Sequence, residues 1–404
     1  KSPIATYSAM EPFDPWSAQD TVDPRELVRA EASAAYALGK LDGRLTRLGE
    51  TEERLFCADL VRRTLLGALT QAGYLDAPER FADWFAGLAR GPERGAEAPS
   101  SALGIVRALL SEMALHPWEP LARTAQTLQR CARFVADEVP LSLEEQAREA
   151  EATTAALVRA RQLVEGLPRP QDAPLPFEAL AALCSAARHD PAFAPIEPGI
   201  RSYDTGEAWV ALAGLRPITP LWALDYALGH HLSRGRTLAQ ALPMPGIVTT
   251  ERLLTRSASV QLQLACAVEV AANAHLRALE TARDRAALLT QRLAGLRRSS
   301  RAGEAWVLLV GFAPLGLDPL MDAVGVSRRG TYALRDALRE VGLAEARQSH
   351  GKVLLVANED AKTSNIRAPV ASNALGPAVD ALDQAMADID RLLARTEDQE
   401  ATGT

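Results

Sequence analysis

The stretch between Thr250 and Arg298 constrains the fold most, because it contains no proline and a single glycine, Gly295. A run of this length without a helix breaker predicts one very long helix, or two helices with a slight break. Apolar side chains recur in it at steps of three, four or seven residues: Leu276, Leu279, Ala286, Leu289, Leu293 and Leu296. Such a stripe faces either the core of the same protein or a partner helix.

The composition favours helix over the whole chain of 404 residues. Apolar residues make up 48% and aromatic residues only 5%, while Ala and Leu are plentiful and β-branched residues are few outside short runs. We therefore expect a mainly α protein. No apolar run reaches the roughly 20 residues that cross a bilayer, and the N-terminus lacks the pattern of a secretory signal. These features predict a cytoplasmic protein without a membrane partner.

Towards the C-terminus, long helical patterns give way to short elements with marked boundaries. The apolar segment Ala302–Phe312 predicts a helix, and Asp318-Pro319 reads as an N-cap followed by the first residue of a second one. That short helix, Leu320–Val324, ends at Gly325, the residue type that accepts a left-handed conformation. Ser327 can then cap a third helix.

A β-hairpin is predicted directly after this third helix, which Gly342 ends. The runs Leu343–Ala346 and Lys352–Val356 lie on either side of the turn Ser349-His350-Gly351. The order of helix, short helix, turn, helix and hairpin is that of a winged helix-turn-helix with a small β-hairpin wing.

The third helix has two different faces. Its apolar side chains recur at helical spacing and predict a buried stripe: Leu334, Ala337, Leu338 and Val341. The opposite face carries a second set at steps of four, three and four: Arg328, Tyr332, Arg335 and Arg339. Arginine at the start of such a helix can pair with guanine edges, and other basic residues neutralise phosphates.

These patterns predict double-stranded DNA as the partner. The expected contact residues are Ser327, Arg328, Arg329, Thr331, Tyr332, Arg335, Arg339, Arg347, His350 and Lys352. Nine Arg and Lys residues against six Asp and Glu residues give positions 297–352 a net charge of +3, so the rest of the chain carries −10 of the total of −7. The alternative is a helical interaction scaffold whose winged domain binds protein.

Breaks in the helical pattern suggest the following organisation: an extended arm over 1–24, a helical domain over 25–167, a proline-rich linker over 168–176, a helical domain over 177–300 that ends in the long helix, the winged helix-turn-helix over 301–357, a linker over 358–374 and an amphipathic helix over 375–396.

A resemblance to known regulators supports the C-terminal assignment. The segment DAVGVSRRGTYALRDALREVGL is similar to the helix-turn-helix core of many bacterial regulators. The whole chain resembles a plasmid-encoded family of rhizobia and their relatives, in which a helical domain of unknown function precedes a C-terminal helix-turn-helix. The resemblance implies DNA binding for Ser327–Arg339, and we expect a transcriptional or plasmid-maintenance regulator.

A second resemblance concerns the N-terminal helices. The segment ALGKLDGRL, Ala37–Leu45, is similar to the region preceding the catalytic core of Fic-type nucleotidyl-transfer proteins, whose catalytic loop reads H-P-F-x-x-G-N-G-R. The only His-Pro here, His116-Pro117, is followed by Trp-Glu-Pro, without a glycine-rich anion cradle. We therefore expect no Fic catalysis. Since no other catalytic motif occurs, neither an enzyme nor a cofactor is predicted.

Metal and redox chemistry are not indicated either. Adjacent histidines on a helix, such as His230-His231, point about 100° apart, so we expect surface histidines rather than a metal site. The cysteines are far apart in apolar helical contexts and predict buried free thiols: Cys57, Cys131, Cys184 and Cys266.

The last helical segment predicts self-association. Apolar residues step by four, three, four, three and four: Leu375, Val379, Leu382, Met386, Ile389 and Leu393. They predict either a coiled-coil seam or a helix that packs on its own chain, for instance against 276–296. A homodimer is expected in either case, because helix-turn-helix proteins commonly read two half-sites. The sequence identifies no small-molecule effector.

Overall fold

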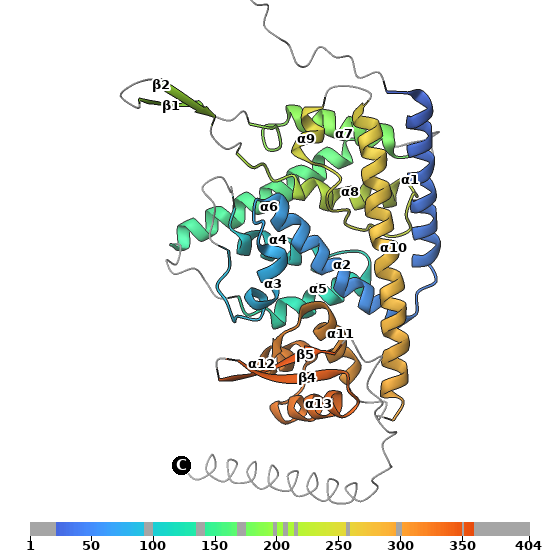
Figure 1. Cartoon of the computed structure of the whole chain (residues 1–404), viewed down its shortest axis with the longest axis vertical. Coiled ribbons are helices and arrows are strands. Elements are labelled where there is room, and N and C mark those ends of the chain that lie inside the picture. Colours follow the sequence, from blue (N-terminus) through green and yellow to red (C-terminus); the bar gives the residue numbers. More distant parts are fainter. Residues whose placement is uncertain are drawn as a thin grey trace, which may run out of the picture. The chain divides into compact units, whose positions relative to one another are not determined.

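The structure is a computed structural model that describes residues 22–92, 100–134, 142–167, 175–196, 200–204, 209–213, 217–255, 259–295, 301–349 and 351–358. Its helices are α1 (Pro24–Leu45), α2 (Glu50–Gln71), α3 (Ala77–Phe85), α4 (Ala102–Ala114), α5 (Glu119–Cys131), α6 (Leu143–Glu165), α7 (Phe177–His189), α8 (Trp222–Arg234), α9 (Thr250–Leu254), α10 (Ser259–Leu293), α11 (Ala302–Phe312), α12 (Leu317–Val324) and α13 (Arg328–Glu340). Its strands are β1 (Ile200–Asp204), β2 (Trp209–Ala213), β3 (Leu315–Gly316), β4 (Ala344–Ser349) and β5 (Lys352–Ala357). The predicted mainly α fold is confirmed (Figure 1).

The stretch from Thr250 onward forms two helices, the short α9 and the long α10, rather than one continuous helix. This is the second of the two predicted alternatives. α1 lies alongside α10 (Figure 1). Hydrogen bonds of 2.7 Å join the two helices, from Ser33 Oγ to Glu269 and from Arg44 to Glu280. The leucine stripe from Leu276 to Leu289 is buried and belongs to the main hydrophobic core. The stripe therefore faces the chain's own core.

α2 lies at the centre of the helical part, and all of its residues except Glu50 and Thr70 are buried or half-buried. The consecutive residues Leu55, Phe56, Cys57 and Ala58 are all buried, which no helix with one solvent-facing side would show. α2 packs against α4, α5, α8 and α10, and also against α11. It thus connects the N-terminal helices to the C-terminal elements.

The C-terminal elements form three helices and a three-stranded antiparallel sheet of order β3-β5-β4. Their core is built around Trp306, which is fully buried and whose Nε1 donates a hydrogen bond to the carbonyl of Leu343 at 3.1 Å. Leu309, Leu338 and Leu355 are also fully buried, and they bring α11, α13 and β5 into one core. The predicted hairpin is present as β4 and β5.

Several local expectations are corrected. α12 begins at Leu317 with Gly316 as its N-cap, so Asp318 lies in the first turn rather than at the cap. A carboxylate in the first turn still stabilises the helix through its favourable interaction with the helix dipole. The antiparallel hairpin β1–β2 lies in a region where no strand was predicted. Cys266 is exposed, whereas the other three cysteines are buried as expected.

The prediction of surface histidines is wrong for His231, which is only 3% exposed. The reason is that α8 is buried over the whole stretch from Trp222 to Gly229, and the same packing also covers His231 and Leu232, although Arg234 is exposed. His230 is half-buried, and its ring lies 5.4 Å from that of His116. None of the described helices combines the length and apolar character that crossing a membrane requires.

Several predicted segments lie outside the described residues. They are residues 1–21 of the arm, 168–174 of the first linker, 359–374 of the second linker, and the C-terminal helix over 375–396 with all of its seam residues. The described residues all belong to a unit that spans 1–359. The finer domain boundaries stay predictions.

Candidate nucleic-acid interface

A tight turn of three residues joins α12 to α13. Gly325 ends α12 in the left-handed conformation, with φ of 70°, which a side chain would disfavour. The Ser327 hydroxyl accepts a hydrogen bond from the Gly330 amide at 3.2 Å and so caps α13. The predicted stop and start of the two helices are thus confirmed at residue level.

Leucines hold α13 against the core of the C-terminal elements. Leu334 and Leu338 are buried, while Ala337 and Val341 are half-buried at the edge of the same stripe. One predicted contact residue also belongs to this buried side. Thr331 is 1% exposed, and its hydroxyl donates to the carbonyl of Ser327 at 3.1 Å. Thr331 therefore stabilises the start of α13. Because its side chain is buried, the prediction that Thr331 contacts DNA is wrong.

The outer face of α13 presents cationic side chains from its first turn onward. Arg328, Arg329 and Arg339 are exposed, and so is Tyr332. Arg328 and Arg329 follow the capping residue directly, so they lie where the helix dipole is positive and where an anionic ligand is favoured. This end of α13 is suited to binding a polyanion.

Arg335 lies differently from its neighbours on the predicted polar face. Its side chain is only 23% exposed and forms an ion pair of 2.7 Å with Asp336. The guanidinium carbon lies 5.0 Å from the ring centroid of Tyr332, a cation–π distance. Arg335 therefore orders the Tyr332 ring and presents less charge to solvent than Arg328 or Arg339.

The hairpin β4–β5 carries the remaining predicted contact residues. Arg347 and Lys352 are exposed, and Arg347 pairs with Glu345 at 3.5 Å on the same strand. Four consecutive residues of β4, from Glu345 to Gln348, are exposed, so both faces of the ribbon there meet solvent. β4 also packs against α13, which places the hairpin beside that helix. His350 lies outside the described residues.

Arg301 has a role that sequence reasoning missed. It was counted only as part of a basic segment, but its guanidinium donates to the carbonyl of Val324 at 2.9 Å and pairs with Glu304 at 3.1 Å. Arg301 thus joins the start of α11 to the end of α12, directly before the turn. No local pattern reveals such a contact, because the two residues lie in different helices.

The side of the C-terminal elements formed by α11 and α12 is covered by the helical part of the chain. α11 packs on α2, where a β-carbon added at Gly311 would lie 3.3 Å from that of Ala58. α12 packs on α5, and Arg133 forms an ion pair with Asp322. The exposed arginines belong to α13, so these contacts leave them accessible.

His116, the histidine of the only His-Pro pair, is held by backbone groups on both ring nitrogens. Nε2 contacts the carbonyl of Ala241 at 2.8 Å, and Nδ1 accepts from the amide of Trp118 at 3.1 Å. Burial lowers the pKa of this imidazole to about 4. The ring thus serves to position two chain segments. In the part of the chain that the structure describes, no cluster of three or more potential metal ligands occurs.

Comparison with known proteins adds no assignment. No model of a known protein family matches the sequence, and a search of curated proteins finds no similar chain. The function is therefore inferred from the residues and their arrangement.

Proposed function

We propose that the chain binds double-stranded DNA through residues 301–357, with α13 as the recognition helix of a winged helix-turn-helix and β4–β5 as its wing. The observation that carries this proposal is the pair of exposed arginines, Arg328 and Arg329, directly after the Ser327 cap. In helix-turn-helix proteins the N-terminal residues of the second helix contact base edges, and arginine pairs there with guanine.

The surrounding geometry supports the same mode of binding. The turn between α12 and α13 is short and capped on both sides, which fixes the direction of α13 relative to α12. Exposed Arg347 and Lys352 on the neighbouring hairpin supply charges for phosphates. In this proposal the protein is a transcriptional or plasmid-maintenance regulator, and it binds as a homodimer, which light scattering of the full chain would reveal.

The double variant Arg328→Ala, Arg329→Ala tests the recognition helix. Against a duplex recovered by repeated selection from a random pool, we expect affinity to fall at least tenfold, since a base-reading arginine contributes about 1–3 kcal/mol. Fluorescence anisotropy with the full chain measures the loss.

A matched control removes the same charge elsewhere. Arg107 on α4 and Arg277 on α10 are exposed side chains. The variant Arg107→Ala, Arg277→Ala should retain the parent affinity. If the α13 variant binds the selected duplex as tightly as this control, α13 is not the recognition helix. Absence of any duplex binding would favour the alternative of a scaffold that binds protein.

A further inference from the structure

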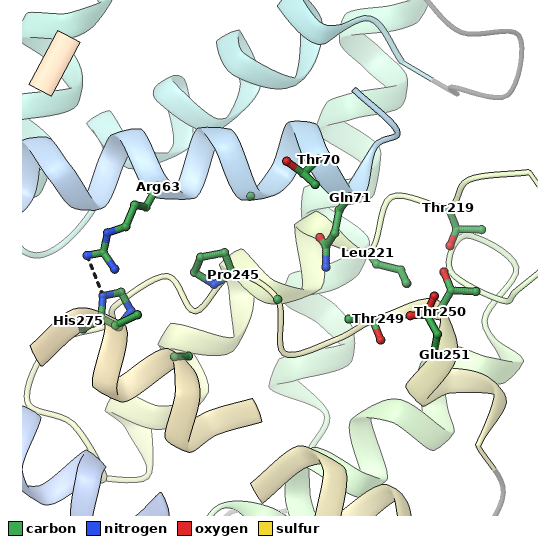
Figure 2. A pocket seen from close by; sticks show the side chains of 14 residues that line it. Arg63, Thr70, Gln71, Thr219, Leu221, Pro245, Thr249, Thr250, Glu251 and His275 are labelled. Carbon is green, nitrogen blue, oxygen red and sulfur yellow. Dashed lines mark hydrogen bonds between the residues drawn. The ribbon is translucent and has the colours of Figure 1, made fainter. Parts of the chain in front are cut away.

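A second polar site lies far from α13, in the helical part of the chain. A cavity of about 670 Å³ is bounded by one face of α2, one face of α10 and the segments that flank α8 and α9 (Figure 2). On α2 its lining extends from Arg63 to Gln71, which at 1.5 Å per residue is about 12 Å along the helix. A cavity of this size holds an organic molecule rather than a single ion.

Arg63 supplies the cation at one end of the cavity. Its Nε donates to Asp59 at 2.6 Å, and Nη2 lies 3.2 Å from Nδ1 of His275 (Figure 2). Among the described residues, Nη1 makes no hydrogen bond. The guanidinium is therefore fixed by two partners on one side, while donors remain on the other. A fixed guanidinium with free donors suits a carboxylate, whose two oxygens match its geometry.

His275 fixes the position of Arg63 and carries no charge itself. The ring is 1% exposed, and burial, together with the charge of Arg63, lowers its pKa to about 3. Because a guanidinium can only donate, Nδ1 must accept, and the ring proton is on Nε2. The ring also makes a hydrogen bond to the backbone of Pro243. His275 thus connects Arg63 to the loop that forms another wall of the cavity.

The loop of residues 243–249 is held in place by Asp225, a buried side chain of α8. Its carboxylate accepts hydrogen bonds from the amides of Gly246 and Val248 and from Gln71 Nε2, at 2.5, 2.7 and 2.8 Å. Gln71 also donates to the carbonyl of Val248 at 2.8 Å, and its own oxygen is buried without a partner. The walls are therefore ordered before any ligand binds, which lowers the entropic cost of binding.

The other end of the cavity is lined by hydroxyl groups and by Glu251, whose carboxylate favours hydroxyls over a second carboxylate there. Thr70, Thr219, Thr249 and Thr250 all line it, and Figure 2 shows the last three at the end away from Arg63. Thr219 is only 7% exposed, so packing holds its side chain in place at this end of the cavity. Because a hydroxyl can both donate and accept, this end of the cavity suits a ligand that carries hydroxyl groups itself.

The remaining lining narrows the class of ligand. No Phe, Tyr or Trp and only one Leu line the cavity in the described part of the chain, so a stacked nucleobase or a long acyl chain would find little support. We propose that the cavity binds a hydroxylated organic acid of mono- or disaccharide size, with its carboxylate on Arg63 and its hydroxyls on the threonines. The proposal does not depend on DNA binding.

Lactobionate and D-glucuronate are suitable probes, with lactose and D-glucose as neutral counterparts. We expect at least one acid to bind the full chain in titration calorimetry and its neutral counterpart to bind at least tenfold more weakly. Arg63→Gln should weaken binding of the acid at least tenfold, because it removes the charge-assisted contact. Arg62→Gln, the adjacent half-buried arginine outside the lining, should change it less than twofold.

Thr219→Val keeps the side-chain shape and removes the hydroxyl, so it tests the other end without touching the ion pair. It should weaken binding about fivefold, the effect of one hydrogen bond. Melting curves without ligand identify any variant that does not fold. The proposal is overturned if neither acid binds the wild type, if Arg63→Gln and Arg62→Gln bind alike, or if AMP binds more tightly than both acids.

Discussion

Replacing Asp225 by asparagine is expected to lower the free energy of unfolding by about 2 kcal/mol, although it removes a buried charge. One carboxylate oxygen accepts from the Val248 amide, and the other accepts from the Gly246 amide and from Gln71. Asparagine has a single acceptor oxygen, so in either orientation its amide hydrogens face at least one of these donors. A buried donor left without an acceptor costs about 1–3 kcal/mol.

The pH dependence gives this prediction a second measurement. Burial raises the pKa of Asp225 to about 7, with the three donated hydrogen bonds opposing the rise. The folded carboxyl therefore holds its proton more tightly than the unfolded chain does. Its contribution to stability is full below about pH 4 and is lost as the pH rises through about 7.

Denaturant unfolding at pH 5 and pH 8 tests both effects. The midpoint of the wild type should fall with rising pH more steeply than that of Asp225→Asn, which has no titrating group there. Asp284→Asn, at an exposed position of α10, should match the wild type at both values. A fully stable Asp225→Asn protein would show that this carboxylate does not hold the 243–249 loop.

Gly229→Ala is expected to destabilise the same region by about 3 kcal/mol, through overpacking. A β-carbon at this position of α8 would lie 2.1 Å from the carbonyl oxygen of Leu242, and backbone cannot move aside as a flexible side chain can. The loop that lines the cavity would have to shift away from α8. The expected result is a lower thermal midpoint and weaker binding of the organic acid, because this loop lines the cavity.

α1 offers a matched control in the same type of element. A β-carbon at Gly39 would have no atom within 4 Å, so Gly39→Ala should keep or raise stability, by up to about 1 kcal/mol. Calorimetric melting of both variants separates helix propensity from the steric effect. Equal midpoints for the two variants would mean that α8 does not approach Leu242 so closely.

Local signals explain why the mainly helical character, and the boundaries near α13, could be predicted from the sequence. Gly325 and Ser327 determine the end of one helix and the start of the next through their own backbone and side-chain preferences, and the structure retains both. The leucine spacing of α13 likewise predicts its buried side. Thr331 shows the limit of this reasoning, because a hydroxyl that bonds back to the preceding turn is buried despite its polar character.

The cavity could not be predicted in this way, because its walls come from segments far apart in the chain. Arg63, Thr219 and His275 lie in different elements, and only packing brings them to one space. Each of them alone matches an ordinary surface or core residue. The hairpin β1–β2 could not be predicted for a different reason. Each of its strands has five residues, and so short a pattern does not stand out from the surrounding helical composition.

The salt dependence of binding to random-sequence duplex DNA tests the central claim most directly. With Arg328, Arg329, Arg339, Arg347 and Lys352 exposed, the logarithm of the association constant should fall with the logarithm of salt concentration with a slope of about −4.5. The variant Arg347→Ala, Lys352→Ala should have a slope shallower by about 2. If the full chain does not bind duplex DNA at low salt, or binds it with no dependence on salt, the proposed function is wrong.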